Sequence, residues 1–185
     1  MSVTALLDAN VLYPAGLRDL LMQLAIFGAF RARWTHQIQD EWVRNVITDR
    51  PDLEPERMRR VAMLMDSSLK DAHIIGYEAT TDTLELPDPN DRHVLAAAIF
   101  VGVNVIVTNN AKDFPASALE PYSIVAMTAD AFVLGLLEED SETVLEAVRT
   151  VQTRLRKPPV TMTAYLARLE QLGLLETAAL LKNHL

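Results

Sequence analysis

The chain has 185 residues, of which half are hydrophobic and 23% are charged, with a formal net charge of −8. This balance is typical of a globular protein, and the length allows one domain or about one and a half. The absence of cysteine excludes disulfides, thiolate metal sites and a cysteine nucleophile, and it fits a reducing cytoplasm.

Neither a secretory signal nor a membrane span is expected. The first residues carry no basic region, and no apolar run approaches the roughly 20 residues that cross a bilayer. The acidity argues against a module that binds nucleic acid by neutralising phosphates. It does not argue against a nuclease, because carboxylates that hold cations make a site acidic until the metal arrives. A simple gain in solubility explains the acidity equally well.

The chain opens with the features of a buried strand followed by a helix. Residues 3–7 are apolar without alternation, which is typical of a parallel strand buried on both faces, and Asp8 follows them. Pro14 suits the first residue of a helix whose leucines recur at helical spacing. Gly28 is a plausible helix stop.

Two further helices and a short strand are expected next. Thr35 is a candidate N-cap for a helix that carries Glu41, and Pro51 breaks this pattern. Pro55 opens the following helix. Residues 73–76 form a candidate short strand.

The middle of the chain predicts a turn, a helix and two strands. Residues 84–91 are turn-like and lead into a helix of small residues suited to close packing on a sheet. Residues 103–107 form a second buried strand, and residues 123–127 form a further one. Because strands alternate with helices, we expect an α/β fold with a parallel sheet flanked by helices.

From Thr128 onward the pattern becomes entirely helical. The expected stretches cover residues 129–139, 141–156 and 161–183, and the last of them has a candidate break at Gly173. We therefore predict two units, a domain over residues 1–127 and a C-terminal helical extension over residues 128–185.

Polar residues follow the predicted strands. In parallel sheets, ligands bind at the carboxyl ends of the strands. Asp8 follows the first strand and Asp113 a later one, while Asp88 and Asp91 stand at a helix N-terminus. Taken singly, each of these is explained as a turn, cap or helix-dipole residue. Taken together, they predict a carboxylate cluster at one edge of the sheet.

Such a cluster favours a hard divalent cation. Like charges at short range raise each other's pKa, and a bound cation removes this penalty. Mg²⁺ and Mn²⁺ prefer oxygen ligands, and the four histidines show no zinc-like spacing. The sequence therefore predicts hydrolysis of a phosphodiester assisted by Mg²⁺ or Mn²⁺.

Three motifs resemble those of PIN-domain ribonucleases. Leu6–Leu12 is similar to the opening strand motif of that family, and Asp91–Ala98 to an acidic ligand that opens an alanine-rich helix. Val107–Phe114 resembles the late-strand motif, and Glu41 fits the position of the second acidic ligand. The resemblance covers about residues 3–127, and Glu41 is chosen over its neighbour Asp40 by this similarity alone.

The resemblance implies roles for the site residues. The catalytic and metal-binding set is Asp8, Glu41, Asp91 and Asp113, with Asn10, Asp88, Thr108 and Asn110 in support. Asp88 is an additional acidic residue whose role as a ligand stays open. Arg92 and Lys112 are the basic candidates for contact with RNA phosphates, although solvation at the surface explains either one.

Many small PIN proteins are VapC-like toxins of toxin–antitoxin pairs, and the chain resembles a longer subgroup with a C-terminal helical extension. The resemblance implies an RNA substrate, a small antitoxin partner and no membrane, and it leaves a homodimer open. The alternative is a catalytically silent PIN module that serves protein interaction. A haloacid-dehalogenase-like phosphatase needs a second Asp at the place of Asn10, and dinucleotide binding needs more glycines than Gly16 offers.

Overall fold

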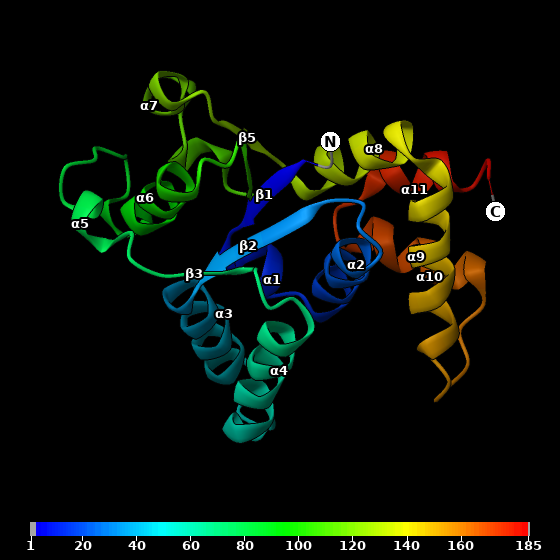
Figure 1. Ribbon diagram of the computed structural model, residues 1–185. Coiled ribbons are helices and arrows are strands. Elements are labelled where there is room, and N and C mark those ends of the chain that lie inside the picture. Colours follow the sequence, from blue (N-terminus) through cyan, green and yellow to red (C-terminus); the bar gives the residue numbers. More distant parts are fainter. Residues whose placement is uncertain (1–2, 185) are drawn as a thin grey trace.

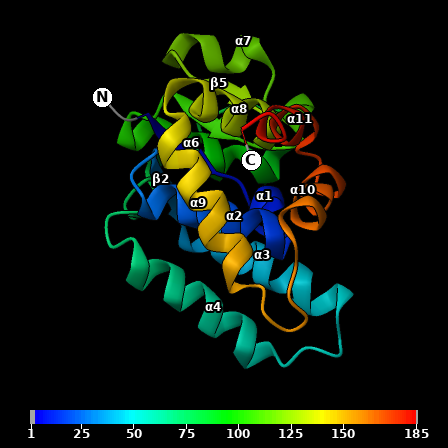
Figure 2. The same cartoon turned by 90° about the vertical axis from the view of Figure 1, so that its right-hand side faces the viewer.

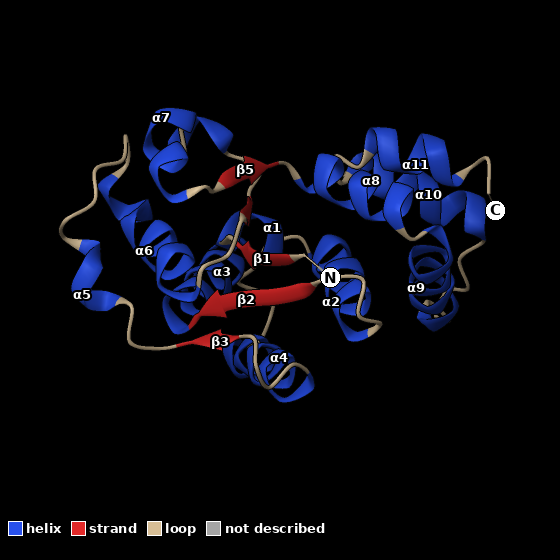
Figure 3. Ribbon diagram, turned by 45° about the horizontal axis from the view of Figure 1, so that its top comes forward, coloured by secondary structure: helices blue, strands red, loops and turns tan. Residues whose placement is uncertain are grey.

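A five-stranded parallel sheet forms the centre of the molecule, with helices around it (Figures 1 and 3). The computed structural model describes residues 3–184. The strand order is β3-β2-β1-β4-β5. The strands are β1 (Thr4–Leu7), β2 (Arg31–Thr35), β3 (His73–Ile74), β4 (Val105–Val107) and β5 (Val125–Met127). The expected α/β fold is thus confirmed.

The longer helices connect the strands and form the C-terminal region. They are α2 (Ala15–Ile26), α3 (His36–Asp49), α4 (Pro55–Ser68), α6 (Arg92–Val101), α8 (Ala129–Glu139), α9 (Ser141–Arg154), α10 (Met162–Gln171) and α11 (Leu175–Leu181). Short helices are α1 (Ala9–Leu12), α5 (Glu78–Thr81), α7 (Ala116–Leu119) and the 3-10 turns η1 (Pro89–Asp91), η2 (Ala111–Asp113) and η3 (Glu120–Tyr122). The predicted cap at Thr35 is confirmed, because its hydroxyl accepts from the Ile38 amide at 3.1 Å.

Strand β2 was not predicted from the sequence. Arg31 and Arg33 alternate along it with the buried Ala32 and Trp34, so it lacks the apolar run of β1. It nevertheless pairs with β1 on one side and β3 on the other. Backbone pairing with both neighbours stabilises β2 as a strand. Its charged side chains explain why the sequence pattern did not predict it.

The order of the strands creates a crevice at the centre of the sheet. β1 pairs with β2 on one side and with β4 on the other, so the direction of the crossovers reverses at β1. Leu7 lies opposite Val107 in the register of β1 and β4. The residues that follow these strands, Asp8 and Thr108, therefore emerge side by side where an open α/β sheet usually binds its ligand.

The buried Arg18 of α2 ties the first helices together. Its guanidinium donates to the Leu12 carbonyl at 2.5 Å and the Tyr13 carbonyl at 3.3 Å, and it lies 4.3 Å from the Trp42 ring centroid. These contacts link the end of α1 to α3. Because α1 begins directly after Asp8, Arg18 braces the helix next to the crevice.

We expect Arg18→Met to destabilise the protein by about 2–4 kcal/mol, because two carbonyls lose a charged donor. For a chain of this size that corresponds to a melting temperature lower by roughly 4–16 °C. Thermal unfolding followed by circular dichroism measures it. Arg149→Met, at an exposed position of α9, is the control, and equal melting of the two variants would contradict the bracing role.

The C-terminal helices share one hydrophobic core with the sheet region. Helices α9 and α10 lie against α2 (Figure 2). Phe132 of α8 meets Phe30 edge-on, with ring centroids 4.9 Å apart. Gly16 of α2 approaches Leu172 closely, since a Cβ added there would lie 2.8 Å from Cδ1 of Leu172. The core therefore continues across residues 127 and 128.

None of the helices within residues 3–184 combines the length and the apolar character that a membrane span requires.

Candidate active site

Asp8 stands at the centre of the candidate site. It is 5% exposed, directly after β1, and serves as N-cap of α1. Its Oδ1 accepts from the Ala9 amide at 2.7 Å, and its Oδ2 accepts from Asn10 at 2.5 Å and from Thr108 at 2.8 Å. Burial raises the pKa of Asp8, and the nearby Glu41 raises it further, against the lowering effect of the hydrogen bonds.

Asn10 and Thr108 fix the orientation of Asp8. The Thr108 hydroxyl is fully buried and donates to Asp8 while it accepts from the Asn10 amide at 2.8 Å. The Asn10 carbonyl oxygen accepts from the Asn109 backbone amide at 2.9 Å. This closed set of contacts joins the ends of β1 and β4, so both residues have the positions expected of supporting groups.

Asp91 is influenced electrostatically by the other carboxylates of the candidate site. It is the N-cap residue of α6, although its side chain makes no capping hydrogen bond. Burial raises the pKa of Asp91 to about 7, and the charges of Asp8, Asp88, Asp113 and Glu41 contribute in that order. The acidic residues predicted from four separate segments thus act on a single group.

Asp88 and Asp113 lie at the edges of the cluster. The Asp88 carboxylate caps η1, accepting from the Asn90 amide at 2.8 Å. Asp113 ends η2, and its carboxylate accepts from the side-chain amide of Asn110. Asn110 also donates its backbone amide to the Thr108 hydroxyl at 3.1 Å. The contacts give Asn110 a place between Thr108 and Asp113, as expected of a supporting residue.

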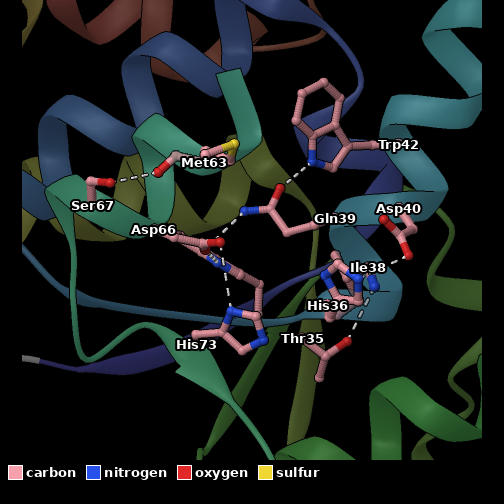
Figure 4. A network of polar contacts seen from close by, with 11 residues as sticks. Thr35, His36, Ile38, Gln39, Asp40, Trp42, Met63, Asp66, Ser67 and His73 are labelled. Atoms are coloured by element: carbon pink, nitrogen blue, oxygen red, sulfur yellow. Dashed lines mark hydrogen bonds and ion pairs between the residues drawn. The ribbon is translucent and has the colours of Figure 1, made fainter. Parts of the chain in front are cut away.

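Glu41 and its neighbour Asp40 point to different sides of α3. Asp40 is directed towards His36, with 3.3 Å between Nε2 and the carboxylate (Figure 4). Glu41 has its Oε2 3.8 Å from Nε2 of the buried His93, and its charge acts on Asp8 and Asp91. Of the two acidic residues, only Glu41 lies with the cluster.

His93 is a site residue that sequence reasoning missed. It is 4% exposed on α6, and its Nδ1 is buried without a hydrogen-bond partner among the described residues. Its Nε2 lies near Glu41, and the two form an ion pair only when the imidazole is protonated. The signal in the sequence was its place two residues after Asp91, within the first turn of α6.

We expect His93→Leu to weaken Mn²⁺ binding about 10- to 100-fold, because a group that orients a ligand is lost. Calorimetric titration of the purified protein with Mn²⁺ measures this. His36→Gln, which changes the exposed histidine of the same α3 face as Asp40, is the control. A folded His93→Leu protein with unchanged affinity would remove His93 from the site.

The two basic candidates differ in exposure. Lys112 is exposed in η2, next to Asp113. Arg92 is half-buried beside Asp91, and its Nε is buried without a hydrogen-bond partner among residues 3–184. Both are sequence neighbours of acidic residues of the cluster, Arg92 of Asp91 and Lys112 of Asp113.

The donor set fits a hard divalent cation. It consists of carboxylate oxygens. Burial, followed by the charges of the neighbouring carboxylates, raises the pKa of Asp91 to about 7, and a bound cation would relieve the repulsive part. Within residues 3–184, no three His, Asp or Glu side chains converge tightly enough to hold a metal ion directly. Mg²⁺ keeps several of its waters in protein sites, so a wider ring of carboxylates suits it.

The comparisons agree with this fold. Residues 4–112 match the family model described as PIN domain, and residues 129–183 match the model of the VapC50 C-terminal domain. The first match covers more than half of the chain. The chain therefore belongs to the PIN domain family.

The chain is also similar to a curated protein. Over 71 residues the chain is 42% identical to the "Putative ribonuclease VapC50" of Mycobacterium tuberculosis. The aligned stretch covers 38% of this chain and 42% of that relative. No solved structure matches the chain.

Proposed function

We propose that this protein is a metal-dependent endoribonuclease and the toxin of a toxin–antitoxin pair. The observation that carries the proposal is the environment of Asp91, where burial and then the charges of four further carboxylates raise the pKa to about 7 in a PIN-family chain. Carboxylates held close together in this way repel one another, and a bound cation would compensate for that repulsion. The name of the mycobacterial relative supports RNA as the substrate.

The residues divide into ligands and supports. Asp8, Glu41, Asp91 and Asp113 would hold Mg²⁺ or Mn²⁺, which supplies Lewis acidity towards water and the scissile phosphodiester. Thr108 and Asn10 hold Asp8 in one orientation, and Asn110 does the same for Asp113. Arg92 and Lys112 would offset the phosphate charge that the carboxylates repel.

The proposal includes a small antitoxin as partner and the cytoplasm as the place of action. The C-terminal match to a domain named after VapC50 supports the toxin setting. The competing proposal is a silent PIN scaffold. The acidic residues around Asp91 speak against it, because a scaffold gains nothing from charges that disfavour the ionised form of a neighbouring carboxylate.

Incubation of the antitoxin-free protein with total RNA tests the proposal. Mg²⁺ or Mn²⁺ is added, and EDTA and the Asp8→Asn protein serve as controls. We expect discrete cleavage products that require both the metal and Asp8. Neither cleavage nor calorimetric metal binding would favour the scaffold instead. Metal binding without cleavage of total RNA would leave the carboxylate site standing and overturn general ribonuclease activity.

A further inference from the structure

A pocket of about 270 Å³ opens beside the carboxylate cluster. Its walls are Asn10, Tyr13, Glu41, Asn45, Thr48 and Asp49. Two of these, Asn10 and Glu41, also belong to the candidate active site, so the pocket and the cluster share a wall. A chain whose phosphate lies at the cluster would bring a neighbouring nucleotide to this pocket.

One helix and one turn supply the remaining wall. Glu41, Asn45, Thr48 and Asp49 recur on α3 at spacings of four, three and one residues and therefore share a face. Tyr13 follows α1 and lies opposite that face. Its phenol donates to Oδ2 of Asp49 at 2.8 Å, which holds both the ring and the carboxylate in place. Among the described contacts, Oδ1 of Asp49 has no hydrogen-bond donor and stays open to a ligand.

The chemistry of the pocket selects its ligand. Two carboxylates repel a phosphate, and the volume is too small for a helix or a base pair. An aromatic ring and hydrogen-bonding side chains are how proteins hold an unstacked base of single-stranded RNA. A carboxylate only accepts hydrogen bonds, so it favours a base with neighbouring N–H donors on one edge. Guanine presents two such donors on its Watson–Crick edge, and Asn45 can serve its carbonyl oxygen.

We propose that this pocket binds an unpaired guanine next to the scissile phosphate, with Asp49 reading the base edge and Tyr13 supporting it. The inference rests on the proposed ribonuclease function and narrows its substrate to single-stranded loops that contain guanine. A duplex would keep this edge of the base engaged with its partner strand.

Cleavage of a hairpin RNA library with a randomised loop tests the subsite. We expect the wild-type protein to prefer guanine at one position flanking the cut by about tenfold or more, as a bidentate contact allows. Asp49→Asn replaces an acceptor with a donor, so the preference for guanine should fall to about twofold or less. Tyr13→Phe, which removes only the contact to Asp49, should give an intermediate preference. Glu146→Gln on the exposed surface of α9 loses the same charge and should cut with the wild-type pattern.

Binding of free nucleosides separates this inference from the nuclease proposal. Chemical-shift titrations of the wild-type protein with guanosine, adenosine, cytidine and uridine need no cleavage. We expect guanosine to bind about tenfold tighter than the others and to lose this advantage in Asp49→Asn. Cleavage without base preference, or equal response to all four nucleosides, would overturn the guanine subsite alone. Guanosine binding without any RNA cleavage would support the pocket and overturn the nuclease.

Discussion

Asp91→Asn is expected to abolish metal-dependent RNA cleavage and, at the same time, to stabilise the metal-free protein above neutral pH. The variant removes a ligand of the proposed cation, so activity should fall by at least about a thousandfold, in the range seen when an essential catalytic group is lost. It also removes the carboxylate on which burial and four neighbouring charges converge. A loss of function combined with a gain of stability is the signature of a strained functional site.

The gain in stability expected for Asp91→Asn increases with pH. The pKa of Asp91 rises from 3.8 in the unfolded chain to about 7 in the folded protein. The stability that Asp91 contributes is present below pH 3.8 and is lost as the pH rises towards and through about 7. The difference in melting temperature between Asp91→Asn and wild type should therefore grow between pH 5 and pH 8. Mg²⁺ should raise the melting temperature of the wild type only, which closes the gap.

Asp88→Asn provides the matched control for the Asp91 experiment. It removes a charge that acts on Asp91, but asparagine preserves the cap that Asp88 makes at Asn90. We expect a smaller gain in stability and retained cleavage. Full loss of cleavage would identify Asp88 as a further ligand. A folded Asp91→Asn protein with wild-type activity, or with a pH profile that runs parallel to that of the wild type, would contradict the assignment of Asp91.

The sequence predicted the cluster because parallel sheets impose a simple rule on position. Asp8 and Thr108 each follow a buried apolar strand, and the register of β1 and β4 brings them together. Asp91 precedes a helix that returns towards the next strand, so it reaches the same edge. Glu41 was the weaker assignment, because a helix gives no such positional rule. Its side of α3 is decided by packing, which turns Asp40 to His36 and Glu41 to His93.

The features that the sequence did not predict depend on contacts between distant segments. β2 carries two arginines, and only its place between β1 and β3 makes it a strand. His93 reads as one more residue of an alanine-rich helix until its distance to Glu41 is known. Arg18 looks like a solvated helix residue, yet its guanidinium is buried on Trp42. In each case a long-range partner outweighs the local pattern.

Contacts between distant segments also cross the predicted boundary after residue 127. A chain cut after Met127 is expected to lose its cooperative thermal transition. The cut exposes the side of α2 that packs on α9 and α10, and it removes Phe132 from the ring of Phe30. Each large apolar side chain left uncovered loses about 1.5–3 kcal/mol. Several of these losses together are comparable to the roughly 5–15 kcal/mol by which a native protein is stable.

A point variant measures this coupling without removing the helices. Phe132→Ala should destabilise the full chain by about 3–5 kcal/mol, which corresponds to a melting temperature lower by roughly 6–20 °C. Phe100→Ala, at a ring that is 55% exposed, should change it little. A normal melt of the shortened chain, with Phe132→Ala equal to Phe100→Ala, would make residues 128–185 a separate module. Collapse of the shortened chain would mean that this PIN fold depends on its C-terminal helices to hold α2, and through Arg18 the helix that follows Asp8.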